Sequence, residues 1–461
     1  MQFLIAFVLL LAIAANEWPT PLTGVPDNHR IWGVLSVQLL LSGLACFRWG
    51  RWEPTRSWYP MICWTLGSLI VTVGLGWSQW VAARFGTFQT GSAIVVLLPH
   101  LASLVLVWVI PLTFAAVATP SRTDRNWAHR WATILGHLRV RFQWQLLPIL
   151  LPLLTVLVMR DVFEQSHTWQ SLTWTLQIGI LASASMMVVL LGFPVVIKWW
   201  LPTQPFADAL FQKHLDSTAR QLKLKLREVA EWNTQQRIAN ALVLGWLPGT
   251  RRILISDVLS WALTKRQLYA VFLHEAGHLR HHHLWWRLSV IVLAGQILLL
   301  GSIATEREFD LVEPNAKPEM FLAILGLVGL LLLTGLLMGL VSRALEFEAD
   351  GFALHQLKAL GPPEPTTDKS DSSGREGADS RIEDLITAIR STAELTGISL
   401  THSTWLHPSV NDRIQRIRLC FASPVLHELM QRRLRILKFS LMTVILLCAG
   451  LLAMHGLLWT I

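Results

Sequence analysis

The sequence predicts a mainly helical membrane protein with about nine spans and two large polar regions. Of its 461 residues, 52% are hydrophobic and only 15% are charged, whereas soluble domains carry about 25% charged residues. The apolar residues also gather in runs close to the length that crosses a bilayer. This composition excludes an ordinary soluble enzyme and an intrinsically disordered chain.

The apolar runs divide the chain into membrane and polar parts. They lie at residues 2–15, 31–47, 61–83, 92–117, 145–159, 172–200, 287–304, 321–341 and 439–461. We therefore expect an N-terminal membrane domain of about six spans at 1–200, a transmembrane hairpin at 287–341 and a C-terminal span at 439–461. Residues 1–15 are either a retained span or a cleaved signal, and the absence of Lys and Arg before the run favours a span.

Charge in the connections predicts how the chain is oriented, because basic loops stay on the cytoplasmic side. The loop 118–144 holds five arginines against one acid, so we place it in the cytoplasm, whereas the acidic loop 305–320 faces outward. Strict alternation then puts 201–286 and 342–438 in the cytoplasm. A bacterial inner membrane is the favoured compartment, although an endoplasmic-reticulum-type membrane obeys the same rule. The net charge of +9 belongs to these loops and indicates no nucleic-acid partner.

The two cytoplasmic regions, 201–286 and 342–438, can meet as one domain. Arg252 to Ser256 predicts a short strand after a Pro-Gly turn. The segment 361–380 is rich in Pro, Ser, Gly and Asp and predicts a disordered insertion. Apolar residues at intervals of three and four predict one amphipathic helix: Phe211, Leu215, Ala219, Leu222, Leu226 and Val229.

The first of these regions contains the pattern H-E-x-x-H at His274, Glu275 and His278. Positions four apart share one face of a helix, so both imidazoles can reach a single Zn²⁺ while Glu275 lies beside the open coordination position. The alternative for these residues is a solvated helical face. The sequence thus predicts a zinc site on this helix.

A third protein ligand is needed if one zinc position is to remain for water. Glu346 and Asp350 are again four apart, on a predicted helix in the second cytoplasmic region. Glu346 would bind the metal, and Asp350 would accept a hydrogen bond from a ligating histidine. The alternative for Asp350 is an acid on a helix surface.

Together the motifs resemble a known family. His274-Glu275-x-x-His278, followed by Glu346-x-x-x-Asp350, is similar to the integral-membrane gluzincin zinc metalloproteases typified by CAAX prenyl protease and bacterial HtpX. The likeness covers roughly residues 205–290 and 340–420. It also takes in Asn240-Ala241, the run Ile253 to Ser256 leading to Ala270-Val271, and His407 to Ile414.

The resemblance implies a small cytoplasmic α+β zincin-like protease domain in which Glu275 is the general base. Residues matching His407 and Arg413 lie near the cleft in the family, where they could stabilise an oxyanion. A loop histidine or a lipid-facing arginine without a catalytic role is an equal alternative. The segment at Asn240 and Ala241 would bind the substrate backbone as an added strand.

Three histidines follow the zinc motif, at positions 281, 282 and 283. They could add ligands to the site. Three consecutive positions on one helix point in three directions, however. We therefore interpret His281, His282 and His283 as a polar cluster beside the membrane.

The leading functional hypothesis is a membrane-embedded zinc endopeptidase that cleaves membrane-associated or misfolded polypeptides at the cytoplasmic face. One alternative is a multi-span protease sensor resembling the β-lactam-responsive transducers, although the large extracellular ligand-binding domain usual in those proteins is not found in this sequence. Another alternative is a non-catalytic membrane scaffold.

Overall fold

A computed structural model describes residues 201–312, 319–360 and 374–458, except Arg237, Trp246 and Trp405, together with 146–163 and isolated positions and short stretches nearer the N-terminus. The fold divides into two compact units, one of residues 1–192 and 317–328, the other of residues 193–316 and 329–461. Each unit is described by itself. The second contains all the candidate site residues.

The first unit is described mainly through helix α7, Leu147–Phe163, which overlaps the predicted span 145–159. Elsewhere in this unit, the buried Trp64 donates its indole N–H to Ser103 Oγ at 2.9 Å and to the carbonyl of His100 at 3.1 Å. The other predicted spans before residue 201 lie wholly or largely outside the described residues.

A four-stranded sheet forms the base of the second unit. Its order is β1 (Thr203–Gln204), β2 (Glu228–Trp232), β4 (Arg252–Ser256) and β3 (Ala241–Leu244). β2 and β4 pair in parallel, whereas β1 and β3 pair antiparallel to their neighbours. Every residue of β4 is buried, and its position agrees with the predicted strand. β3 is an edge strand of this sheet, which leaves one side of its backbone free to pair.

Three helices that connect or follow the strands begin at well-formed N-terminal caps. α10 (Ala209–Gln221) begins where Asp208 accepts hydrogen bonds from two backbone N–H groups. Ser256, at the end of β4, caps α11 (Asp257–Ala262). Thr264 caps α12 (Lys265–Arg280) and forms a capping box with Gln267. Such caps satisfy backbone donors that the first helical turn leaves free.

The predicted amphipathic helix from Phe211 to Val229 is too long. α10 ends at Gln221, and Lys223 and Lys225 adopt left-handed backbone conformations with φ of 54° and 47°. These two residues turn the chain, so Val229 lies in β2. The apolar spacing continued by chance through a turn into a strand.

Helices that follow α14 in the sequence complete the domain. α15 (Gly374–Leu395) packs against α12, and α16 (Val410–Ala422) packs against α15. Their buried faces join one core with the sheet, which includes Leu215, Ile253, Phe272, Leu385 and Ile414. The first helix of this pair also corrects a prediction, because residues 374–380 of the predicted disordered insertion are helical. They extend a helix whose buried face continues at Ile382 and Leu385, while 361–373 lie outside the described residues.

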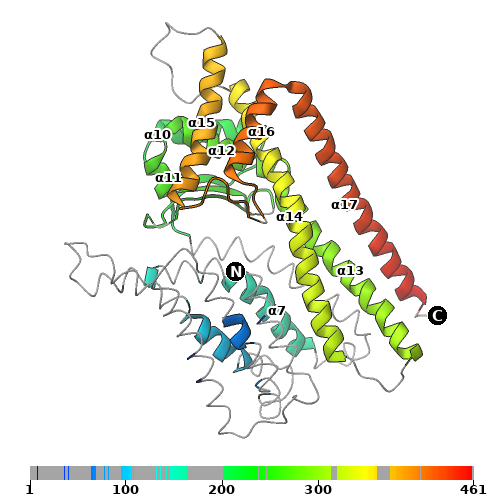
Figure 1. Ribbon diagram of the computed structural model, residues 1–461. Coiled ribbons are helices and arrows are strands. Elements are labelled where there is room, and N and C mark those ends of the chain that lie inside the picture. The colour runs from blue at the N-terminus through cyan, green and yellow to red at the C-terminus, as the bar shows by residue number, and fades with distance from the viewer. Residues whose placement is uncertain are drawn as a thin grey trace. The chain divides into compact units, whose positions relative to one another are not determined.

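Three long helices extend from this domain: α13 (His283–Val312), α14 (Glu319–Leu360) and α17 (Pro424–Leu458) (Figure 1). Among the described residues, these are the helices long and apolar enough to cross a membrane, at His283–Gly301, Val328–Leu360 and Pro424–Met454. They contain the predicted spans 287–304, 321–341 and most of 439–461. The total of about nine spans remains a prediction, because most of the other predicted spans lie outside the described residues.

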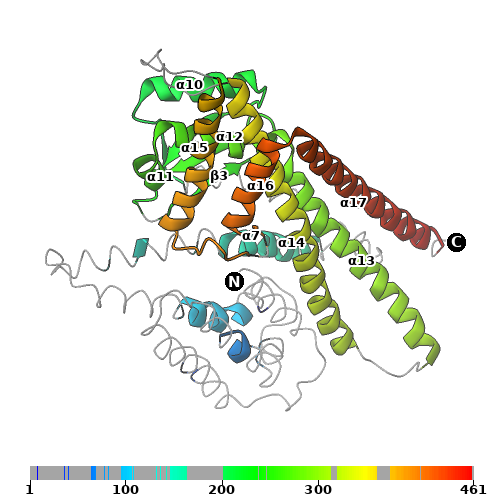
Figure 2. The ribbon, with the colours of Figure 1, turned by 45° about the horizontal axis from the view of Figure 1, so that its top comes forward.

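The three long helices pack through a separate apolar cluster, which holds Val290 and Leu293 of α13, Val341 and Leu345 of α14, and Leu441 of α17. α14 runs without a break from this cluster into the domain that contains the sheet, as both ribbon views show (Figures 1 and 2). Its C-terminal half therefore brings Glu346 and Asp350 to α12.

Candidate metal centre

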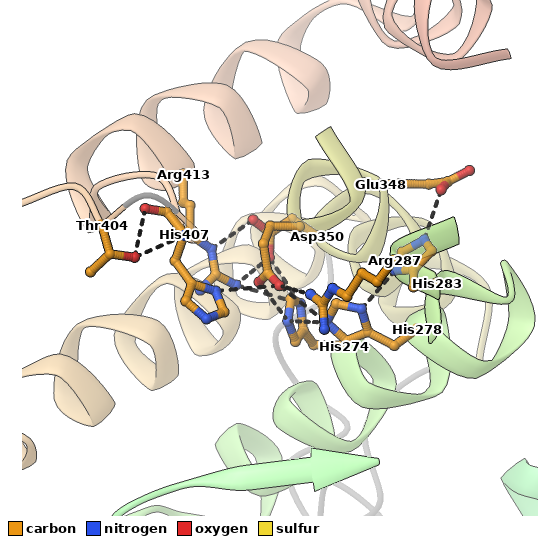
Figure 3. A network of polar contacts seen from close by, with 10 residues as sticks. His274, His278, His283, Arg287, Glu348, Asp350, Thr404, His407 and Arg413 are labelled. Carbon is orange, nitrogen blue, oxygen red and sulfur yellow. Dashed lines mark hydrogen bonds and ion pairs between the residues drawn. The ribbon is translucent and has the colours of Figure 1, made fainter. Parts of the chain in front are cut away.

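Two imidazoles of α12 point toward one position. His274 and His278 lie one turn apart, and their Nε2 atoms are 3.2 Å from each other (Figure 3). Both side chains are largely buried, at 12% and 13% exposure. Gly277 between them allows α12 to approach α14 closely, since a Cβ there would lie 3.1 Å from Ala349 Cα.

Glu346 of α14 completes a set of three donors. One carboxylate oxygen lies 3.6 Å from His274 Nε2, and the other lies 3.7 Å from His278 Nε2. Ligand atoms about 2.0–2.1 Å from a tetrahedral zinc are roughly 3.3–3.5 Å from one another. The two imidazole nitrogens are 3.2 Å apart, and each has a different Glu346 oxygen at 3.6 or 3.7 Å, separations close to this value. The three side chains therefore fit one zinc ion.

Glu275 lies beside this donor set. Its carboxylate, His274 and His278 present ligand-type atoms that all lie within 4.8 Å of one another. Burial raises the pKa of Glu275, and the charge of Glu346 raises it further, while His274 and the arginines oppose the shift. A buried carboxylate with an increased proton affinity is suited to accept a proton from water.

A carboxylate supports His274 directly. Asp350 Oδ1 lies 3.0 Å from His274 Nδ1, so Nδ1–H donates to Asp350 and Nε2 is the ring atom that a metal would bind in place of a proton. Arg413 of α16 holds Asp350 through two hydrogen bonds, of 2.6 and 2.9 Å. Burial lowers the pKa of His274, but the hydrogen bonds that its ring donates to Asp350 and Glu346 outweigh this effect and raise that pKa to about 9. This corner of the site favours positive charge.

A second imidazole supports His278. His278 Nδ1 lies 2.6 Å from His283 Nδ1, and His283 Nε2 lies 2.7 Å from Glu348 Oε2. Glu348 also contacts Lys438 Nζ at 2.7 Å and His281 Nδ1 at 3.2 Å. Burial holds the pKa of His278 well below its usual value, so its imidazole is neutral and able to bind a metal.

His281 and His283 do belong to a polar cluster, but the expectation that the three histidines point in three directions is wrong. His281 and His283 converge on Glu348, and His283 is only 1% exposed. The reason is a break between two helices: α12 ends at Arg280, His282 has a φ of 57°, and α13 begins at His283. Directions expected for a single helix therefore do not apply.

Two further nitrogen-bearing side chains reach Glu346. Arg287 Nη2 of α13 lies 3.0 Å from Oε1, and His407 Nδ1 lies 3.4 Å from the same oxygen. His407 is half exposed, at 54%, in the loop before α16, where its backbone N–H donates to Thr404 Oγ1 at 2.9 Å. This loop is held in turn by Arg343, which donates to the Thr404 carbonyl at 3.0 Å.

A cleft of about 570 Å³ opens beside the donor set. One wall is the edge strand β3, preceded by Asn240, whose backbone pairs with Ser256 of β4. The opposite wall comes from α15 and includes Leu385 and Ile389. The cleft also contains Glu275, His407 and Arg413. An extended peptide placed along β3 would therefore pass the three donors.

The structure thus brings together all the residues predicted for the site. Sequence analysis missed His283, Arg287, Glu348 and Lys438. Glu348 was inside the second motif, between the predicted ligand Glu346 and Asp350, and Lys438 ended the basic run before the last span. No periodicity distinguishes these residues from ordinary surface charges.

The H-E-x-x-H residues lie on α12, and Glu346 of α14 lies beside the two histidines. Residues 206–420 match the profile of peptidase family M48. The chain is 26% identical over 180 residues to a CAAX prenyl protease 1 homolog of Arabidopsis thaliana, an alignment that covers 36% of this chain and 42% of the plant protein. It is also 26% identical over 205 residues to a Protease HtpX homolog of Helicobacter acinonychis, covering 42% and 64%.

Among solved structures, the chain is similar to the crystal structure of S. mikatae Ste24p, with a TM-score of 0.46 and 15% identity over 84% of this chain and 98% of that one. The curated relatives are matched over less than two thirds of their own length. Residues 206–420 thus match peptidase family M48, and the resemblance to CAAX prenyl protease and HtpX is confirmed.

Proposed function

We propose that the protein is a membrane-embedded, zinc-dependent endopeptidase that cleaves membrane-associated or misfolded polypeptides at the cytoplasmic face. The observation that carries this proposal is the convergence of His274 Nε2, His278 Nε2 and both Glu346 oxygens beside the buried Glu275. Three protein ligands leave a fourth zinc position for water, as in catalytic zinc sites.

When bound, zinc lowers the pKa of water toward neutrality and polarises the scissile carbonyl. Glu275 accepts the proton of the attacking water and passes it to the leaving amine. His407, which reaches into the cleft from its loop, donates a hydrogen bond to the oxygen that becomes negatively charged. Arg413 lines the cleft as well, but two of its N–H groups bind Asp350, so its main role is to hold His274 through that carboxylate.

The substrate backbone adds to the sheet at β3. This strand lies at the edge of the sheet and lines the cleft with Asn240 and Ala241. Strand addition supplies hydrogen bonds that do not depend on the substrate side chains. The proposal therefore favours an extended or unfolded peptide over a folded protein.

The cytoplasmic orientation rests on charge. Arg432, Arg433 and Arg435 lie in the first part of α17, and basic residues that flank a span stay on the cytoplasmic side. Reporter fusions after residues 312 and 458 test this. Both reporters are expected on the outer side of the membrane. A reporter after residue 312 that lies in the cytoplasm would contradict the orientation.

Glu275→Gln is the decisive variant. It keeps the size of the side chain but removes the proton acceptor, so cleavage of labelled casein by the detergent-solubilised protein should fall by at least about 10²–10⁴-fold. About one zinc per chain should remain bound in both proteins. Glu383→Gln, which changes an exposed acid of α15, is the matched control and should cleave normally.

Two results would contradict the proposal. Unchanged cleavage by Glu275→Gln would remove Glu275 from the reaction. A purified wild-type chain that binds no zinc would favour a scaffold without catalysis. If neither result is found, the substrates that the inactive Glu275→Gln variant traps can be identified by mass spectrometry, and they would define the natural peptide.

A further inference from the structure

A buried chain of polar groups connects the C-terminal membrane helix to His278. Lys438 Nζ of α17 donates to both oxygens of Glu348, at 3.0 and 2.7 Å. Glu348 of α14 accepts from His283 Nε2 at 2.7 Å, and His283 Nδ1 lies 2.6 Å from His278 Nδ1. Figure 3 shows the part from Glu348 through His283 to His278. Four helices each contribute one member.

The chemistry of the donors fixes the direction of these hydrogen bonds. A carboxylate only accepts, so the proton between Glu348 and His283 belongs to His283 Nε2. A neutral His283 then carries a lone pair on Nδ1 and accepts from His278 Nδ1–H. His278 consequently has no proton on Nε2, the atom 3.2 Å from His274 Nε2. The network selects the tautomer of His278 that can bind a metal.

Stability alone is a poor reason for such a network. Glu348 and Lys438 have side-chain exposures of only 5% and 16%, and buried ion pairs often stabilise a fold no more than apolar residues of similar size. The way in which these groups orient His278 has a clearer consequence. Groups behind a metal-bound histidine determine its tautomer and ring orientation and influence metal affinity.

We propose that His283, Glu348 and Lys438 are positioning residues that hold His278 ready to bind zinc, so that the C-terminal membrane helix helps to set the metal affinity of the site. The inference rests on the proposed zinc centre. It adds a role for α17, which contributes none of the proposed ligands, and for the histidine that follows the H-E-x-x-H helix.

Zinc affinity of the full-length protein in detergent, measured by competition with a chromophoric chelator, tests this proposal. His283→Phe keeps a flat ring but has no polar atom, and we expect zinc affinity to fall by about 10–100-fold. His281→Gln is the matched control, because His281 contacts the same carboxylate but no proposed ligand. Its zinc affinity should equal that of the wild type.

A conservative variant distinguishes positioning from simple packing. In His283→Gln, the amide oxygen can accept from His278 and the amide nitrogen can donate to Glu348. This variant should recover much of the affinity that His283→Phe loses, although a glutamine resembles the ring less in shape. Lys438→Met should show a smaller loss, because Glu348 remains bonded to His283.

The tautomer can be observed without zinc. In ¹⁵N-histidine NMR of the metal-free full-length chain, subtraction of the His278→Gln spectrum should reveal an imidazole protonated on Nδ1. A proton on Nε2 would overturn the proposal, whatever the zinc affinities.

These experiments distinguish a failure of the proposed function from a failure of the positioning role. A wild-type chain that binds no zinc contradicts the proposed function. A wild-type chain that binds zinc, with His283→Phe binding it equally tightly, contradicts the positioning role alone. If His283→Phe does not fold, the NMR measurement decides: a proton on His278 Nε2 overturns the role, and a proton on Nδ1 supports it.

Discussion

His274 and His278 lie one turn apart on the same helix, yet the groups behind them differ. Asp350, held by Arg413, contacts His274 directly. Behind His278, a neutral imidazole stands between the ligand and the carboxylate of Glu348. The pKa of His274 is raised to about 9 by its carboxylate partners despite burial, whereas burial holds that of His278 well below its usual value.

This difference separates two functions of a supporting group. A carboxylate in contact with an imidazole supplies both orientation and negative charge, and the charge favours a cation at that corner. The imidazole of His283 orients His278 through a hydrogen bond but separates it from the carboxylate of Glu348 by the width of one ring. Lys438 then neutralises that carboxylate. The groups behind His274, from α14 and α16, thus supply charge, and the groups behind His278, from α13, α14 and α17, supply orientation.

The largest expected effect comes from removing the charge behind His274. Asp350→Asn keeps an acceptor for His274 Nδ1–H but leaves the buried Arg413 without its anion. Breaking a buried pair in this way should lower the free energy of unfolding by about 3–5 kcal/mol, measured by denaturant titration in detergent. Glu383→Gln breaks an exposed pair with Arg418 and should cost at most about 1 kcal/mol.

Asp350→Asn combined with Arg413→Met sharpens this test. Removing both partners leaves no unpaired charge, so part of the lost stability should return. A double variant less stable than Asp350→Asn, or a single variant as stable as Glu383→Gln, would show that the charge behind His274 contributes little.

Gly277→Ala should disturb both sides of the centre equally. The added methyl group would lie 3.1 Å from Ala349 Cα and 3.2 Å from Phe352 Cδ1, so α12 and α14 must separate slightly. We expect overpacking to cost about 1–3 kcal/mol, offset by up to about 1 kcal/mol of helix propensity, and zinc affinity to fall. Both quantities can be measured in the same samples.

Gly295→Ala provides the control for this substitution. Gly295 lies in α13 and a Cβ there would meet nothing within 4 Å, so zinc affinity should not change. Equal zinc affinity in the Gly277→Ala protein would contradict the idea that the close approach of α12 and α14 sets the donor distances.

The smallest expected effect is that of the cap on α12. Thr264→Ala removes the hydroxyl that accepts from the Gln267 backbone N–H, and such losses cost about 1 kcal/mol. The cap supports neither histidine directly. Thermal unfolding should shift while zinc affinity stays constant; a weakened zinc site would mean that α12 is positioned from its N-terminus as well as from the groups behind its histidines.

Much of the site could be predicted because its signals are local. The H-E-x-x-H spacing places His274 and His278 on one helical face, and the same spacing relates Glu346 to Asp350. Apolar runs of bilayer length located the three long helices. Local signals failed where the chain changes direction: at Lys223 and Lys225, which end α10, and at His282, which separates α12 from α13.

The sequence by itself determined which residues can bind a metal, because a helix fixes the relation between side chains one turn apart. Only the tertiary structure decided what stands behind each of them. His283 meets Glu348 across 65 residues of sequence, and Lys438 meets Glu348 across 90. Such contacts depend on how α13, α14 and α17 pack, and packing arises from the shapes of whole buried faces, which no short pattern records.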